Sequence, residues 1–164
     1  MKLGSLSELM LEQLQDIYDA EHQIVDALPK MVKAASTPEL KTAFTEHLTL
    51  TKTHIERLES VFDILGVPAK RKACKGMKGV LSEADEMLKE DAEESVMDAG
   101  LISAAQHVEH YEMASYGTIR TYADLLGHEE IKRILQGTLD EEQATDIALT
   151  KLARKINVEA MEGQ

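Results

Sequence analysis

The chain has 164 residues, of which 30 are acidic and 18 basic, for a formal net charge of −12. This excess of negative charge would be repelled by nucleic acids and by anionic membrane surfaces. Aromatic residues make up only 4% of the chain, and tryptophan is missing, so no base-stacking surface is indicated. We therefore expect a protein that binds neither nucleic acid nor membrane, built as one domain over 1–164.

Glycine and proline residues mark the ends of five helical segments. In chain order, the helices are expected at about 5–35, 38–65, 77–92, 95–127 and 129–158. Ser5 and Glu8 form a capping box at the first start, and Pro38 favours the second. Pro29 lies well inside the first segment and should either kink that helix or end it early. The tail, 161–164, should fray.

The helix lengths indicate the topology. Four segments have roughly 28–32 residues each, or about 42–48 Å at the rise of an α-helix. Short connections make antiparallel pairs of the first two and the last two, while 67–94 is long enough to cross the bundle. We predict an all-α, ferritin-like antiparallel four-helix bundle whose one long crossover carries a short fifth helix. The alternative, an elongated coiled-coil hairpin, is disfavoured because the apolar stripes exceed an a/d seam in width.

Acidic residues interrupt these apolar stripes where a helix would normally bury leucine. They are Glu21, Glu109, Glu112, Glu142 and Asp146. A buried carboxylate is costly unless a cation neutralises it, which leaves basic side chains or metal ions. Arg57 and Arg120 could supply such ion pairs, and for one carboxylate alone that interpretation is favoured. For the set of five, metal is favoured, because basic residues are scarce on the stripes.

The second helix adds imidazoles to this set. His47, Thr51 and His54 follow at i, i+4 and i+7 and share one edge of its buried face. Carboxylates with imidazole are the ligands of di-iron and di-manganese bundles. The ligands expected from the sequence are Glu21, His54, Glu109, Glu112, Glu142 and Asp146. His54 could equally be a core histidine, and His47 is a weaker candidate.

Two neighbouring positions stay open at this stage. A modest rotation of the last helix would exchange Glu141 with Glu142. Tyr116 lies one turn beyond Glu112 and either packs in the core or hydrogen-bonds a ligand carboxylate.

Cys74 is the only cysteine, which excludes an internal disulfide and is typical of the reducing cytoplasm. Nearby basic residues would lower the pKa of an exposed thiol and favour a redox role. We favour the alternative, in which Cys74 is a small apolar residue packed against the bundle.

Longer motifs resemble a known family. The segment 98–112, DAGLISAAQHVEHYE, continues into ASYGT at 114–118; LDEE at 139–142 and YDAE at 18–21 are further matches. Together they resemble the YciF-type stress-associated ferritin-like proteins of bacteria. The resemblance implies a rubrerythrin-like bundle, a homodimer, expression under envelope, osmotic or oxidative stress, and a dinuclear metal site.

One departure from that family concerns the second helix. Family members commonly have acidic residues just before Thr51, where this chain has Thr49 and Leu50. The Glu-x-x-His pair of ferritin-like helices is therefore missing there, and the last helix offers Glu142 and Asp146 instead. The site expected is rich in carboxylate and poor in histidine.

Two functions are consistent with these features. The leading one is stress protection, in which dinuclear iron or manganese reacts with a small oxidant such as peroxide, by peroxide-detoxifying or ferroxidase-type chemistry. The alternative is a non-catalytic structural or partner-binding stress protein whose metal site is vestigial or inert. Iron storage is disfavoured, because nothing in the sequence indicates a large cage.

Overall fold

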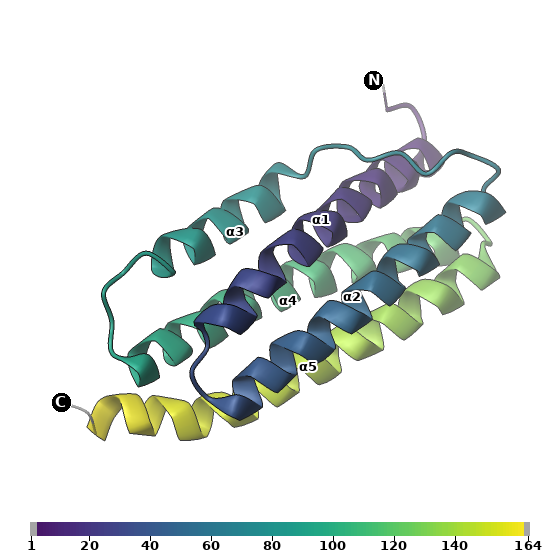
Figure 1. The fold of residues 1–164 in the computed structure, drawn as a ribbon. Helices are drawn as coiled ribbons and strands as arrows, with labels where there is room; N and C mark the ends of the chain where they lie inside the picture. The colour runs from purple at the N-terminus through teal and green to yellow at the C-terminus, as the bar shows by residue number, and fades with distance from the viewer. Residues whose placement is uncertain (1–2, 163–164) are drawn as a thin grey trace.

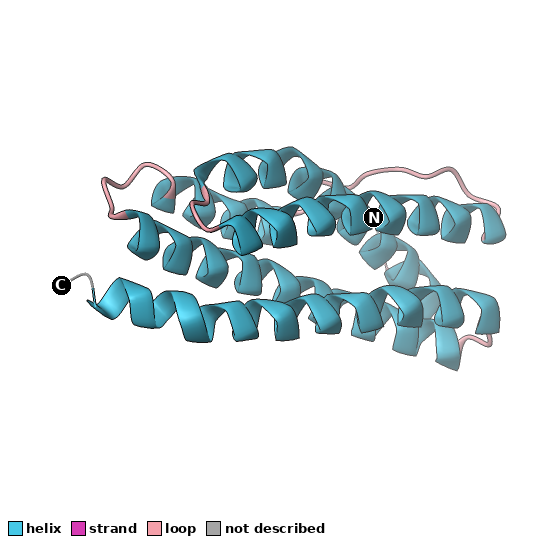
Figure 2. Cartoon of the chain, turned by 60° about the horizontal axis from the view of Figure 1, so that its bottom comes forward, coloured by secondary structure: helices cyan, strands magenta, loops and turns pink. Residues whose placement is uncertain are grey.

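The computed structural model describes residues 3–162, and the regular structure in this range is entirely helical (Figure 1). The helices are α1 (Leu6–Ala34), α2 (Pro38–Ile64), α3 (Lys75–Met87), α4 (Glu94–Leu125) and α5 (Glu129–Glu162). Figure 2 shows helices joined by loops, with no strand among the described residues. No helix in this range is long and apolar enough to cross a membrane.

The four long helices form the bundle that the sequence predicts. α1 packs against α2 and α4, and α5 packs against α4 and α2, so each long helix has two neighbours. The connection between α2 and α4 carries α3, which lies over α1 and α4 on the outside of the bundle (Figure 1). The all-α architecture with one long crossover is thus confirmed.

Capping chemistry fixes the helix ends. Ser5 Oγ accepts a hydrogen bond from the Glu8 amide at 3.2 Å, as the capping-box pattern predicts. Gly66 and Gly127 follow the C-caps of α2 and α4, and their φ angles of 69° and 76° lie in the left-handed region that favours glycine. At Gly66 the next amide bonds back to the Phe62 carbonyl at 3.1 Å, which closes a Schellman motif.

α1 continues through Pro29 to Ala34, within about one residue of the expected end, so the helix does not end early at the proline. Two other boundaries differ from the sequence prediction. α3 spans Lys75–Met87, earlier at both ends than expected, because Cys74 accepts the Met77 amide hydrogen bond and caps it. α5 extends to Glu162, beyond the expected end at about 158. Of the tail expected to fray, 161–162 are helical, and 163–164 lie outside the described residues.

Asp98 fixes the turn between α1 and α2, a role that the sequence does not reveal. It is fully buried on α4, and its two carboxylate oxygens accept hydrogen bonds from the amides of Ser36 and Thr37, each at 2.8 Å. The Thr37 side chain itself does not cap α2. A carboxylate from α4 therefore occupies the capping position and stabilises the positive end of the α2 dipole.

Candidate metal centre

Four carboxylates and two imidazoles meet inside the bundle. The acidic residues come from α1, α4 and α5, each is 0% exposed, and they are Glu21, Glu109, Glu112 and Glu142. α2 contributes His47 and His54, which are 2% and 0% exposed. All four long helices thus supply a side chain to one polar layer within an apolar core.

These residues form two groups that share one member. Donor atoms of His47, Glu109, Glu112 and Glu142 lie within 4.8 Å of one another, and so do those of Glu21, His54 and Glu142. In the first group, His47 Nδ1 lies 2.8 Å from Glu109 Oε1. In the second, His54 Nδ1 lies 2.9 Å from Glu142 Oε1 and 3.6 Å from Glu21 Oε1. Glu142 belongs to both groups.

Most donor atoms in the cluster have no hydrogen-bond partner. Within 3–162, ten buried side-chain nitrogen and oxygen atoms lack one, and nine of these belong to the six cluster residues. They include both oxygens of Glu109, Glu112 and Glu142, and also His54 Nδ1 despite its 2.9 Å approach to Glu142. Ligands of a common cation lie this close to one another without the alignment of a hydrogen bond. Without such a cation, each orphaned group would cost roughly 1–3 kcal/mol.

Basic side chains do not neutralise the cluster. For the described part of the chain, the ion pairs of these four carboxylates involve only His47 and His54. Arg57 instead binds Glu141, with its two terminal nitrogens 2.7 and 2.8 Å from the carboxylate oxygens. Arg120 leaves its own buried Nε without a partner. The interpretation of the cluster as a salt bridge to Arg57 or Arg120 is therefore not supported.

The cluster shifts the pKa values of its own members. Burial, reinforced by the charge of Glu142, raises the pKa of Glu21 to about 7. Burial and the neighbouring acidic groups also hold the pKa values of Glu109 and Glu112 far above the usual range. Burial acts on Glu142 too, but the close approach of the His54 imidazole, 2.9 Å away, outweighs it and lowers the pKa of Glu142. The raised pKa values favour the protonated form of these carboxyl groups, and a bound cation would displace the protons.

Asp146 is the one expected ligand that the structure does not bring to the cluster. Its side chain is 20% exposed, and its carboxylate accepts a hydrogen bond from Gln106 Nε2 at 3.1 Å. His110 Nε2 lies 3.3 Å from the same oxygen. Asp146 follows Glu142 by one turn and lies closer to the surface between α4 and α5. His47, the weaker candidate from the sequence, lies in the cluster.

Comparisons with known proteins place the chain in a family. The profile of a domain of unknown function, DUF892, matches residues 5–162. The chain belongs to the DUF892 family. Protein YciF of Escherichia coli K12 is 42% identical over 154 residues, which cover 93% of each chain.

Solved structures agree with this DUF892 assignment. The crystal structure of the E. coli stress protein YciF has a TM-score of 0.91 at 41% identity, covering 94% of this chain and 98% of that one. YcfI of Rhodopseudomonas palustris has a TM-score of 0.89 at 42% identity, covering 91% and 95%. A Xanthomonas campestris protein, 22% identical, has a TM-score of 0.77 with 97% of each chain covered, and shows the fold alone. The resemblance to YciF-type proteins is confirmed.

Two further side chains hold cluster residues of this DUF892 protein in place. The Tyr116 hydroxyl donates a hydrogen bond to Glu21 Oε1, and the ring is itself fully buried. Glu141 Oε2 lies 2.8 Å from His54 Nε2, so the other ring nitrogen faces Glu21 and Glu142. The structure thus separates the roles of Glu141 and Glu142: the former supports an imidazole, and the latter lies in the cluster.

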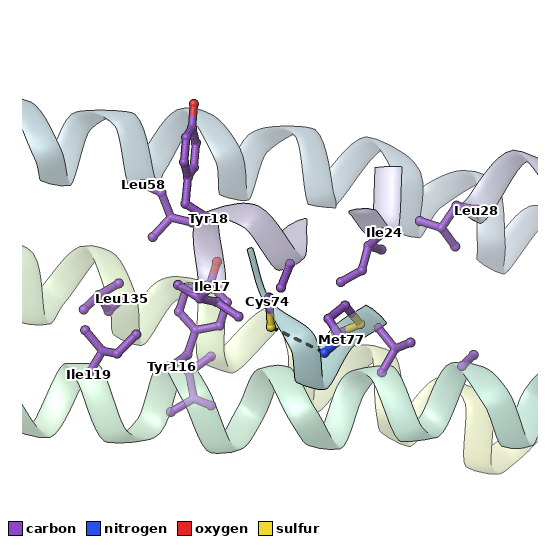
Figure 3. Close-up of a cluster of buried hydrophobic side chains, with 14 of the residues drawn as sticks. Ile17, Tyr18, Ile24, Leu28, Leu58, Cys74, Met77, Tyr116, Ile119 and Leu135 are labelled. Atoms are coloured by element: carbon purple, nitrogen blue, oxygen red, sulfur yellow. Dashed lines mark hydrogen bonds between the residues drawn. The ribbon is translucent and has the colours of Figure 1, made fainter. Parts of the chain in front are cut away.

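Cys74 is a core residue rather than a reactive surface thiol in this DUF892 protein. Figure 3 shows it among buried side chains such as Ile17 and Ile24, with the Met77 amide bonded to its sulfur. The thiol is 1% exposed and lies 3.1 Å from the Tyr111 hydroxyl. Burial raises the pKa of Cys74, so the nearby basic residues do not activate it.

The donor set fits a pair of divalent cations. Four hard carboxylates and two imidazoles are the ligands that iron and manganese prefer in helical bundles. The two groups that share Glu142 give each cation at least three protein donors. The orphaned atoms of both groups would be satisfied at once by two ions.

Proposed function

We propose that this DUF892 protein is a stress-response protein that binds two iron or manganese ions and uses them to react with a small oxidant. The observation that carries the proposal is the set of nine buried polar atoms without hydrogen-bond partners, contributed by four helices to one layer. Such a set is costly to fold unless cations fill it.

Each residue of the cluster has a definite role in this proposal. Glu21 and His54 would hold one ion, and His47, Glu109 and Glu112 the other, with Glu142 as the ligand common to both. When bound, two such ions would supply the two electrons that, together with two protons, reduce one hydrogen peroxide to two waters. Tyr116 and Glu141 keep Glu21 and His54 in position, and the surrounding apolar residues limit access of water.

The stress role rests on the relatives. YciF of E. coli, which is described as a stress protein, is similar to this chain over nearly its whole length. A cytoplasmic location belongs to the same proposal, because the only cysteine is a free, buried thiol. Peroxide consumption or ferroxidase-type oxidation is the reaction class that such a carboxylate-rich centre performs.

A structural role is the second candidate. YcfI of R. palustris, 42% identical to this chain, is described as a proposed structural protein. The second helix also has Thr49 and Leu50 at the positions just before Thr51 where YciF-type proteins commonly have acidic residues. In that case the cluster would be vestigial or would hold an inert ion that only stabilises the bundle.

Peroxide consumption distinguishes the two candidates. Metal-free protein is loaded anaerobically with Fe²⁺ or Mn²⁺, freed of unbound ions by desalting and mixed with hydrogen peroxide, and the remaining peroxide is measured over time. We expect consumption by the wild type and by Glu130→Gln, an exposed control on α5, and its loss in Glu112→Gln. A wild type that binds the ions but leaves the peroxide intact would support the structural role instead.

A further inference from the structure

On its α3 side, the buried cluster borders a small apolar cavity. This cavity of about 10 Å³ lies beside His47 and is lined otherwise by apolar side chains such as Ile24, Leu28 and Met31. Its volume is too small for more than about one water, and His47 is the one lining side chain with a nitrogen or oxygen donor atom that could replace part of an ion's hydration shell. A hydrated ion does not fit this cavity.

A groove between α2 and α5 reaches the same residue from solvent. It has a volume of about 240 Å³, enough for on the order of eight waters, and its sides include the small residues Ala43, Ala144 and Ala148. His47 lines this groove as well as the small apolar cavity. The groove therefore has room for a hydrated ion, and a member of the cluster lines it.

His47 connects the groove with the carboxylates. It is 2% exposed, yet its Nε2 has no hydrogen-bond partner and lies 3.9 Å from Glu112 Oε2. Its Nδ1 lies 2.8 Å from Glu109 Oε1. His47 therefore lines the groove while both of its ring nitrogens lie near carboxylates of the cluster, and an imidazole in this position is a ligand for a cation that has lost part of its water.

The charges of the groove favour a cation over an anion. Glu46 is exposed along it, and the residues that line it contain no lysine or arginine. Glu141 also lines it, but Arg57 neutralises that carboxylate. The net charge of −12 adds a field that concentrates cations near the mouth.

We infer that the α2–α5 groove is the route by which divalent cations enter and leave the cluster, with His47 as the first inner ligand. This inference rests on the proposed function, because it assumes that the cluster binds metal. A route of this kind controls the rates of loading and release equally. It leaves the equilibrium affinity, which the buried ligands determine, unchanged.

Blocking the groove tests the route. Co²⁺ is mixed with metal-free protein, and its absorption gives the loading rate; a chelator then gives the release rate. We expect Ala144→Trp to slow both rates by on the order of tenfold at an unchanged dissociation constant. The matched control is Ala114→Trp, an exposed alanine on α4 outside the groove, which should load like the wild type.

A second variant tests the charge of the groove without adding bulk. Glu46→Lys should slow loading and weaken its dependence on salt, because it removes the attraction at the mouth. Equal loading rates in the wild type, Ala144→Trp and Glu46→Lys would overturn the route but leave the metal site standing. A wild type that binds no Co²⁺ at equilibrium would overturn both. Weaker equilibrium binding by Ala144→Trp at an unchanged loading rate would also contradict the route.

Discussion

Glu141 holds the imidazole of His54 from outside the cluster. Glu141 Oε2 lies 2.8 Å from His54 Nε2, while His54 Nδ1 faces Glu142 Oε1 at 2.9 Å. Arg57 binds both oxygens of Glu141 and fixes its carboxylate plane. This contact favours the tautomer with the proton on Nε2 and leaves Nδ1 facing the buried carboxylates. A metal at that position needs this tautomer.

Replacing Glu141 with Gln should therefore weaken metal binding although Glu141 is not itself a ligand. An amide in place of the carboxylate makes a weaker partner for the imidazole and loses the ion pair with Arg57. We expect the affinity for Mn²⁺ or Fe²⁺ to fall by about 10- to 100-fold. Isothermal titration measures this, with Asp140→Asn, an exposed charge removal at the adjacent position, as control. If the two variants bind metal equally, Glu141 has no supporting role.

Replacing Glu112 with Gln should have opposite effects on the metal-free and metal-loaded protein. Burial holds the pKa of Glu112 well above its usual range, so the metal-free fold pays for protonating it at neutral pH. A neutral amide avoids this cost and should raise the free energy of unfolding by about 1–3 kcal/mol. The same amide removes a charged ligand, so the stabilisation by added metal should largely disappear.

Thermal unfolding of Glu112→Gln with and without Mn²⁺ measures both effects. The exposed residue Glu130 provides a control, Glu130→Gln, which should leave both melting temperatures close to those of the wild type. A metal-free Glu112→Gln that melts below the wild type, together with a wild type that does not respond to metal, would indicate a structural polar cluster instead.

The metal-free protein should lose stability as the pH rises. The pKa of Glu21 is raised from 4.5 to about 7, and those of Glu109 and Glu112 are raised further. These groups keep protons in the folded state that the unfolded chain releases. Their stabilising contribution is complete below the unfolded pKa and is lost as the pH rises through the folded pKa.

Above neutral pH, the two histidines of the cluster do not oppose this effect. Burial lowers the pKa of His47, which contributes with the opposite sign, but that imidazole is neutral in both states above about pH 7. Burial acts on His54 too, but Glu142 and Glu21 outweigh it and raise the pKa of His54, so its stabilising contribution is also lost as the pH rises. We expect the melting temperature of the metal-free protein to fall between about pH 7 and about pH 9. Metal binding in this range should release protons, measurable by calorimetry in buffers of different ionisation enthalpy. A melting temperature that rises over this window would refute the assignment.

The sequence predicts the fold and most of the cluster because both depend on helical period. Four carboxylates interrupt apolar stripes at core positions, so their burial follows from the pattern alone. His47 carried a usable signal as well, since seven residues differ from two full turns by only about 20°, which places it on nearly the same face as His54.

Asp146 shows the limit of that argument. Four residues exceed one turn by about 40°, so Asp146 fits the stripe of Glu142 but rotates toward the surface, where Gln106 and His110 meet it. The choice between Glu141 and Glu142 depends on the rotation of α5 against its neighbours, which no local pattern fixes. Asp98 caps α2 through a contact between residues about 60 positions apart in the sequence. The helical period of the sequence carries no information on such a contact.

Dimerisation stays a proposal that rests on the YciF-type resemblance. Leu11 and Met113 are half-buried against the core of the bundle. Large apolar side chains that are exposed, such as Leu125 at 72% and Ile147 at 55%, remain available for an interface. Light scattering at micromolar concentration should give the mass of two chains, and the mass of one chain would exclude the dimer.

The number of metal ions per chain tests the central claim most directly. Protein purified without chelators is analysed by elemental analysis, and the metal-free protein is then titrated with Fe²⁺ or Mn²⁺ under anaerobic conditions. The two donor groups that share Glu142 predict two ions per chain, a higher melting temperature with metal, and proton release on binding. Protein that contains no iron or manganese and whose melting temperature is the same with and without added metal would contradict the account.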